Sequence, residues 1–141
     1  MTTQQVTIEL PELILHRLTQ LAEATHQSVE VLISQSVLSN LPPSTEIAPL
    51  ELRQEFLRMH TLSVESLRPI AQAQVDPVQF ERHTELLQKN EAGNLSPEDR
   101  EELTSLRVTA EQLMLRKAYA WSLLRWRGQR IPSLEELRLT A

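Results

Sequence analysis

The segment at residues 6–11 constrains the fold of this chain more than any other feature. Apolar and polar residues alternate strictly from Val6 to Leu10, which predicts a short β-strand with one apolar face. Pro11 ends this strand and suits the first turn of a helix, where the missing N–H of proline costs nothing. A lone strand leaves its backbone hydrogen-bonding groups unpaired, and no second segment of the sequence alternates comparably. We therefore expect this strand to pair with the same strand of a second copy.

Two amphipathic helical patterns follow the strand. In the first, apolar residues recur near helical spacing and form one stripe. This stripe consists of Leu13, Leu18, Leu21 and Ala22, with Ile14 beside it. The second pattern begins at Ser28, a favourable N-cap residue, with Glu30 in the first turn, where the helix dipole favours a negative charge. Its expected buried side consists of Val29, Leu32, Ile33, Val37 and Leu38. Prolines 42 and 43 end the pattern, because proline disfavours helix in the residue before it.

The order strand, helix, turn and helix resembles the ribbon-helix-helix family of small dimeric DNA-binding proteins. The resemblance rests on the segment VTIELPELILHRLTQLAEATHQSVEVLISQSVLSNL, in about the first third of the chain. It implies that two copies form an antiparallel ribbon whose exposed side chains read the major groove of DNA. Carried over residue by residue, the reading positions are Gln5, Thr7 and Glu9. The resemblance further implies that the start of the second helix, at Ser28 and Val29, holds a DNA phosphate through backbone N–H groups.

The charge of this segment leaves two roles open. Residues 1–42 contain four glutamates and one arginine, a net charge of −3 with neutral histidines. Non-specific affinity for DNA comes mostly from cations that neutralise phosphates, so DNA binding and dimerisation without DNA remain alternatives. The family usually has a glycine two positions before the capping serine, where this chain has His26. A left-handed turn is possible at a histidine at some cost in free energy, so the predicted fold accommodates it.

The composition predicts a mostly helical protein. Only two of the 141 residues are glycine, and none is cysteine, which excludes disulfides, thiolate metal sites and cysteine nucleophiles. No segment approaches the roughly 20 apolar residues of a membrane span, and the N-terminus has no secretion signal. The sequence therefore predicts a cytoplasmic protein without a membrane contact.

Catalytic motifs are absent from the sequence. The four histidines are scattered, without the spacing of a metal site, and the two glycines form no phosphate-binding loop. Adjacent carboxylates, such as Glu101 and Glu102, point to different sides of a helix. We therefore expect no enzyme activity, no catalytic residue, no metal and no cofactor.

The sequence predicts three regions. Residues 1–42 are the expected ribbon-helix-helix domain for dimerisation and DNA binding, residues 43–62 a linker and connecting helix, and residues 63–141 a helical interaction domain. The apolar spacing of the connecting helix favours packing against a neighbouring helix, with exchange between protomers and folding on a partner as alternatives. In the third region, Ser63, Asp76, Ser96 and Ser133 each have the character of a helix N-cap. The helix that starts after Ser96 is expected to run from Pro97 to about Arg127.

This long helix carries a reversal of charge. Residues 46–105 have a net charge of −6, whereas residues 107–130 have a net charge of +5 and three of the five aromatic residues. One interpretation is that Tyr119 and Trp121 are core residues and that the arginines pair with acidic helices of the same domain. A second is a docking surface for an acidic partner protein, since Trp, Tyr and Arg dominate interface hot spots. A third is nucleic-acid binding. The candidate partner-binding residues are Arg116, Lys117, Trp121, Arg125, Trp126, Arg127 and Arg130.

Taken together, these patterns predict a mostly α-helical homodimer. Its N-terminal ribbon-helix-helix unit has one short intermolecular β-strand and two helices, and an all-helical C-terminal domain with one long helix follows. The resemblance implies a transcriptional regulator of antitoxin type that binds an operator in double-stranded DNA and holds a toxin or another partner protein. The alternative is an adaptor in which the ribbon only dimerises and the Arg/Trp-rich helix docks a partner protein.

Overall fold

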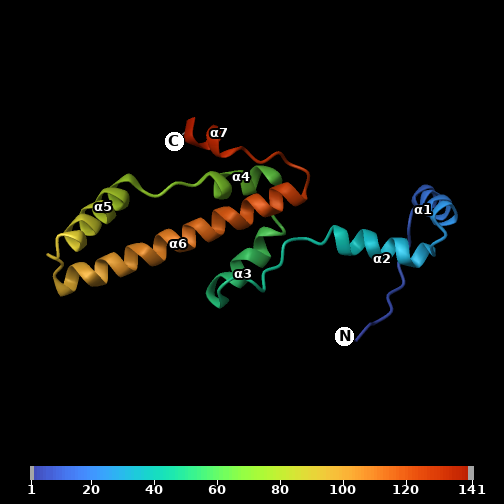
Figure 1. Cartoon of the computed structure of the whole chain (residues 1–141), viewed down its shortest axis with the longest axis horizontal. Coiled ribbons are helices and arrows are strands. Elements are labelled where there is room, and N and C mark those ends of the chain that lie inside the picture. Colours follow the sequence, from blue (N-terminus) through green and yellow to red (C-terminus); the bar gives the residue numbers. More distant parts are fainter. Residues whose placement is uncertain (1, 140–141) are drawn as a thin grey trace. The chain divides into compact units, whose positions relative to one another are not determined.

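The computed structural model of the protein describes residues 2–139. The chain forms two compact units, Met1–Leu41 and Pro42–Ala141, called here the first and the second unit. Regular secondary structure in the described residues is helical, and the longest helix lies in the second unit (Figure 1). The predicted mostly helical architecture with one long helix is therefore confirmed.

The first unit contains α1 (Glu12–Thr25) and α2 (Val29–Ser39). A left-handed residue joins them, because His26 has φ 55° and ψ 39° and its N–H donates to the carbonyl of Ala22. The Ser28 hydroxyl accepts a hydrogen bond from the Val31 N–H at 3.1 Å and so caps α2. Both the predicted start of the second helix and the left-handed turn at His26 are present.

The predicted strand is not seen in the described chain. Residues 2–10 have no regular secondary structure, and Pro11 stands at the N-cap of α1, one position before the helix begins. The expected partner of this strand was a second copy rather than another segment of the same chain. The intermolecular ribbon therefore stays a prediction.

The second unit contains α3 (Leu50–Met59), α4 (Val64–Gln72), α5 (Pro77–Glu91), α6 (Pro97–Trp126) and α7 (Leu134–Leu139). Side-chain caps start several of these helices at the predicted residues. The Asp76 carboxylate accepts from the Val78 N–H at 2.8 Å. The Ser96 hydroxyl accepts from the Asp99 N–H while the Asp99 carboxylate accepts from the Ser96 N–H, which is a capping box. Local chemistry thus fixes where these helices begin.

The core of the second unit lies around the C-terminal half of α6. Apolar side chains of α6 pack there against α3 and α4. The buried residues are Ala48, Leu52, Phe56, Met59, Leu67, Ala71, Tyr119, Ala120, Leu123 and Leu124. The rings of Phe56 and Tyr119 stack with centroids 4.4 Å apart. Residues 43–62, expected as a linker and connecting helix, lie within this unit, and α3 packs against α6 of the same chain.

The N-terminal part of α6 lies beside α5, and the two helices are in contact (Figure 1). Leu86 of α5 and Leu103 of α6 are buried. None of the helices in residues 2–139 combines the length and apolar character of a membrane span.

Candidate functional site

The first unit presents an extensive apolar surface. Among its described residues, Ala22 and Leu32 are the buried apolar side chains. Large apolar side chains that the sequence places on inner stripes are exposed instead, with Leu13 at 69% and Leu38 at 72%. The exposed set is Val6, Ile8, Leu13, Ile14, Leu15, Leu21, Val31, Val37, Leu38 and Leu41. Where exposed apolar side chains join into a continuous patch, they mark interaction sites in soluble proteins.

An open groove of about 560 Å³ follows one face of α1. Its lining residues recur at helical spacing, and they are Ile14, Arg17, Leu18, Gln20, Leu21 and Ala24. Three of the lining residues are large and apolar, so this open face of α1 is mainly apolar. The groove adds a concave part to the exposed surface of the first unit.

The predicted DNA-contacting residues all belong to this unit. Gln5, Thr7 and Glu9 are exposed, in a segment without regular structure. Ser28 is exposed and its hydroxyl serves as the cap of α2, while Val29 is half-buried at the first position of that helix. The structure thus leaves the three reading positions open to solvent and places the other two at the α2 N-terminus.

The predicted partner-binding arginines in and just after α6 are largely engaged within the second unit. The Nε of Arg116 donates to Glu55 Oε1 at 2.7 Å. Arg127 donates to the carbonyl oxygens of His60, at 2.8 Å, and Leu62, just beyond the end of α3. Arg130 forms an ion pair with Glu136. These contacts match the interpretation in which the arginines hold the domain together.

The remaining residues of this set differ in exposure. Trp121 is half-buried against the core, and Lys117 is half-buried on the same helix. Arg125 is exposed, and Trp126 keeps 40% of its surface exposed. Of the seven predicted partner-binding residues, Arg125, Trp126 and Arg130 are therefore exposed, and the other four are half-buried.

A polar cluster inside the second unit was not foreseen from the sequence. Tyr119, which is 6% exposed, donates from its hydroxyl to the Pro43 carbonyl at 3.0 Å. The same hydroxyl lies 2.6 Å from the Nε2 of His60. Burial raises the pKa of the Tyr119 phenol. His60 lies 59 positions and Pro43 lies 76 positions before Tyr119 in the sequence. No local sequence pattern could therefore have predicted these contacts.

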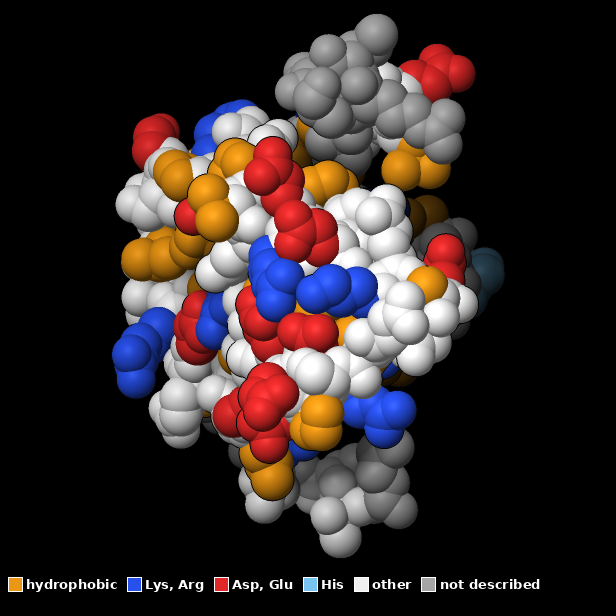
Figure 2. Space-filling view, turned by 90° about the vertical axis from the view of Figure 1, so that its left-hand side faces the viewer, with side chains coloured by type: hydrophobic (Ala, Val, Ile, Leu, Met, Phe, Trp, Pro, Cys, Tyr) orange, Lys and Arg blue, Asp and Glu red, His pale blue; other side chains and the backbone are white. Residues whose placement is uncertain are grey.

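A second cluster ties α5 to α6 near the loop that joins them. Arg82 donates to both carboxylate oxygens of Glu102, at 2.8 and 2.9 Å, and to Asp99 at 3.3 Å. Arg82 also bonds Glu85, and Lys89 lies 3.6 Å from Asp99. Figure 2, which faces this end of the second unit, shows basic side chains surrounded by acidic ones. Arg82 and Lys89 are therefore paired with acidic side chains at this end.

The cluster lowers the pKa of two carboxyl groups. The hydrogen bonds from the Arg82 guanidinium lower the pKa of Glu102, against an opposing effect of partial burial. Partial burial alone would raise the pKa of Asp99. The hydrogen bond from the Ser96 backbone and the charge of Lys89 outweigh this effect, so the pKa of Asp99 is lowered as well.

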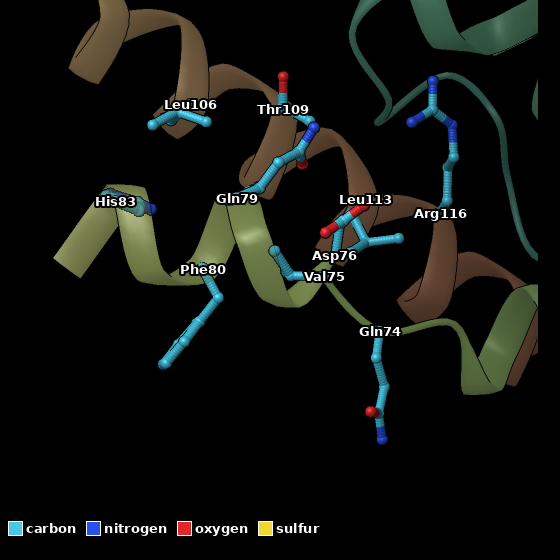
Figure 3. Close-up of a pocket in the computed structure, with 11 residues that line it drawn as sticks. Gln74, Val75, Asp76, Gln79, Phe80, His83, Leu106, Thr109, Leu113 and Arg116 are labelled. Atoms are coloured by element: carbon cyan, nitrogen blue, oxygen red, sulfur yellow. The ribbon is translucent and has the colours of Figure 1, made fainter. Parts of the chain in front are cut away.

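A pocket of about 420 Å³ lies between α5 and α6 (Figure 3). It is lined by Gln74, Val75, Asp76, Gln79, Phe80, His83, Leu106, Thr109, Ala110, Leu113 and Arg116. Gln79 extends toward Thr109, whereas the ring of Phe80 projects away from α6 and is 63% exposed. No pattern in the sequence indicated that a pocket separates α5 and α6 here.

The described residues contain no group of three or more His, Asp or Glu side chains that could hold a metal ion. Comparison with known proteins gives no match: no family model, no curated protein and no solved structure is similar to this chain.

Proposed function

We propose that this chain is a dimeric ribbon-helix-helix regulator that binds DNA through its first unit and a partner protein through its second unit. In this proposal the segments at residues 5–10 of two copies pair as an antiparallel ribbon. The ribbon presents Gln5, Thr7 and Glu9 to the major groove. The partner protein is a toxin or a protein of similar role, as in antitoxin-type regulators.

The observation that carries this proposal is the apolar surface of α1 and α2 in the first unit. A unit of about forty residues rarely has enough buried surface to fold alone, and here the buried apolar side chains described are Ala22 and Leu32. A second copy offers the same exposed apolar side chains and the same alternating segment at residues 5–10, so a twofold arrangement would cover both at once. The left-handed His26 and the capping Ser28 supply the tight turn that such a helix pair requires.

Glu9 and the net charge of −3 shape the expected mode of DNA binding. Few phosphates can be neutralised by residues 1–42, so affinity must come from base contacts and from backbone N–H groups at the start of α2. Glu9 can accept a hydrogen bond from a cytosine amino group. We therefore expect the logarithm of the binding constant to fall only shallowly with the logarithm of salt concentration.

Fluorescence anisotropy with duplex DNA tests this proposal. The duplex from the region upstream of the chain's own gene is compared with a random duplex at about 0.15 M salt, where surface charges are screened beyond roughly 8 Å. The double variant Gln5→Ala and Thr7→Ala should weaken binding at least tenfold while the dimer mass is kept. The matched control is Gln35→Ala, an exposed residue of α2. Equal affinity for both duplexes would contradict the proposal.

A second candidate function is a dimeric adaptor that binds no DNA. The observation that favours it is the open surface of the second unit, where the 420 Å³ pocket adjoins the exposed ring of Phe80. On this alternative, the product of a neighbouring gene binds the second unit when the two are co-expressed. Phe80→Ser or Arg125→Glu should then abolish co-purification without a change of dimer mass, and Thr104→Ala, at an exposed position of α6, should not. Preference for the upstream duplex would favour the regulator instead.

A further inference from the structure

We propose that residues 43–48 form a strap that Tyr119 and Arg53 hold on the second unit, and that this strap limits how far the two units can separate. The sequence predicted a linker and connecting helix over residues 43–62. The structure instead gives half-buried Pro43 and Thr45 and a buried Ala48, which is 7% exposed and belongs to the core. The strap is independent of DNA binding, because all its contacts lie within the second unit.

The first attachment is the hydroxyl of Tyr119. It donates to the Pro43 carbonyl at 3.0 Å, and the ring is fixed by stacking on Phe56. A phenol has one proton to donate, so the His60 Nε2, at 2.6 Å, must be the donor in its contact with the Tyr119 oxygen. Arg127 in turn donates to the His60 carbonyl and so helps to position this residue. Rotation of the Tyr119 hydroxyl would therefore break its hydrogen bond to the Pro43 carbonyl.

The second attachment is the guanidinium of Arg53 at the other end of the strap. Its Nη2 donates to the Glu46 carbonyl at 2.8 Å and its Nε donates to the Ala48 carbonyl at 3.0 Å. Inside the strap, the Ala48 N–H donates to the Thr45 carbonyl at 3.1 Å. Charge-assisted hydrogen bonds such as those of Arg53 are stronger than neutral ones. Both ends of the strap are therefore held by side chains of the second unit.

The strap determines the length of the connection between the units. Because α2 ends at Ser39, residues 40–42 are the part of the connection outside both α2 and the strap. Release of the six strap residues would add up to about 20 Å of reach, at roughly 3.3 Å for each extended residue. The effective concentration at which one unit meets a ligand held by the other depends on such reach.

Hydrogen exchange on the full chain tests the two attachments. Tyr119→Phe keeps the stacked ring and removes the hydroxyl, and Arg53→Met keeps the stem and removes the guanidinium. We expect exchange of the hydrogen-bonded amides of Glu46 and Ala48 to rise at least tenfold in the double variant, with unchanged protection in α4 and in the C-terminal half of α6. Arg58→Met, at an exposed arginine of the same helix α3, is the matched control. Arg53→Met alone also tests the proposal, since it removes no core side chain.

Spin-label distances test the effect on reach. The chain has no cysteine, so Glu23→Cys in α1 and Thr104→Cys in α6 give one label pair for each chain. Excess unlabelled chain suppresses signals between copies. The distance distribution should broaden in the Tyr119→Phe and Arg53→Met double variant and stay unchanged in Arg58→Met. Wild-type exchange at Glu46 and Ala48 in the double variant, or faster exchange without a broader distance distribution, would overturn the proposal.

Discussion

His26 shows how much a single backbone conformation contributes to the first unit. Its φ of 55° is the one positive value at a non-glycine residue among the described positions. A left-handed conformation costs an L-residue roughly 1–2 kcal/mol, because the Cβ crowds the following carbonyl. This left-handed conformation allows the chain to turn from α1 into α2 within three residues. The hydrogen bonds from His26 and Gln27 to the Ala22 carbonyl offset part of its cost.

His26→Gly should therefore stabilise the first unit. Glycine adopts this conformation without strain but loses more freedom on folding, so we expect a net gain of about 0.5–1 kcal/mol. His26→Ala keeps the Cβ and should give no gain. The measurement is amide exchange in α1 and α2, with the fluorescence of Trp121 and Trp126 as an internal control, because both lie in the second unit. Slower exchange in the alanine variant than in the glycine variant would refute this account.

At the scale of elements, sequence reasoning was accurate where the cause is local. A helix start depends on a capping residue and the three residues after it, so Ser28, Ser63, Asp76 and Ser96 could all be identified. The left-handed glycines that follow α5 and α6, Gly93 and Gly128, are local signals of the same kind.

Contacts between distant residues could not be predicted in this way. Nothing near Arg127 in the sequence indicates that its guanidinium bonds carbonyls 65 and 67 positions earlier. The same holds for Tyr119 and Pro43. The acidic excess in residues 46–105 and the basic excess in residues 107–130 did suggest internal pairing, and Arg116 with Glu55 is an example. A charge pattern can thus indicate that pairs exist, while the fold decides which residues form them.

The cluster that joins α5 to α6 should make this helix pair sensitive to acid. The pKa of Glu102 and of Asp99 is lowered in the folded chain. Such groups stabilise the fold above the ordinary carboxyl pKa of about 4, and this contribution is lost as the pH falls through the lowered value. We expect amide exchange in α5 to accelerate below about pH 4 relative to α4, after correction for the intrinsic effect of pH.

Arg82→Met separates the causes of these two shifts. The shift of Glu102 comes mainly from Arg82, so its pKa should return to the ordinary range. Asp99 keeps the hydrogen bond from Ser96 and the charge of Lys89, so its pKa should stay lowered. Carbon NMR titration of the two carboxyl groups measures both values. An unchanged titration of Glu102 would show that the guanidinium is not its main partner.

At the scale of the whole molecule, the two units differ in how they can be stable. The second unit has a core of ten buried residues contributed by α3, α4, α6 and the segment before α3. The first has two buried apolar side chains among its described residues and ten large apolar residues exposed. Burial of apolar surface is the main favourable term in folding. The second unit can therefore fold within one chain, whereas the first depends on what covers its apolar surface.

This contrast leads to a prediction about unfolding. If a second copy covers the first unit, its transition should depend on protein concentration, with a loss of about 2.7 kcal/mol for a hundredfold dilution. The transition of the second unit should not. Circular dichroism follows the helices of both units, while tryptophan fluorescence follows the second unit alone, so the two signals should separate on dilution. Leu13→Glu, at an exposed leucine of α1, should abolish the concentration-dependent transition, and Leu50→Glu, at an exposed leucine of α3, should leave both transitions unchanged. Superimposable curves from the two signals at every concentration would mean that the first unit folds without a second copy.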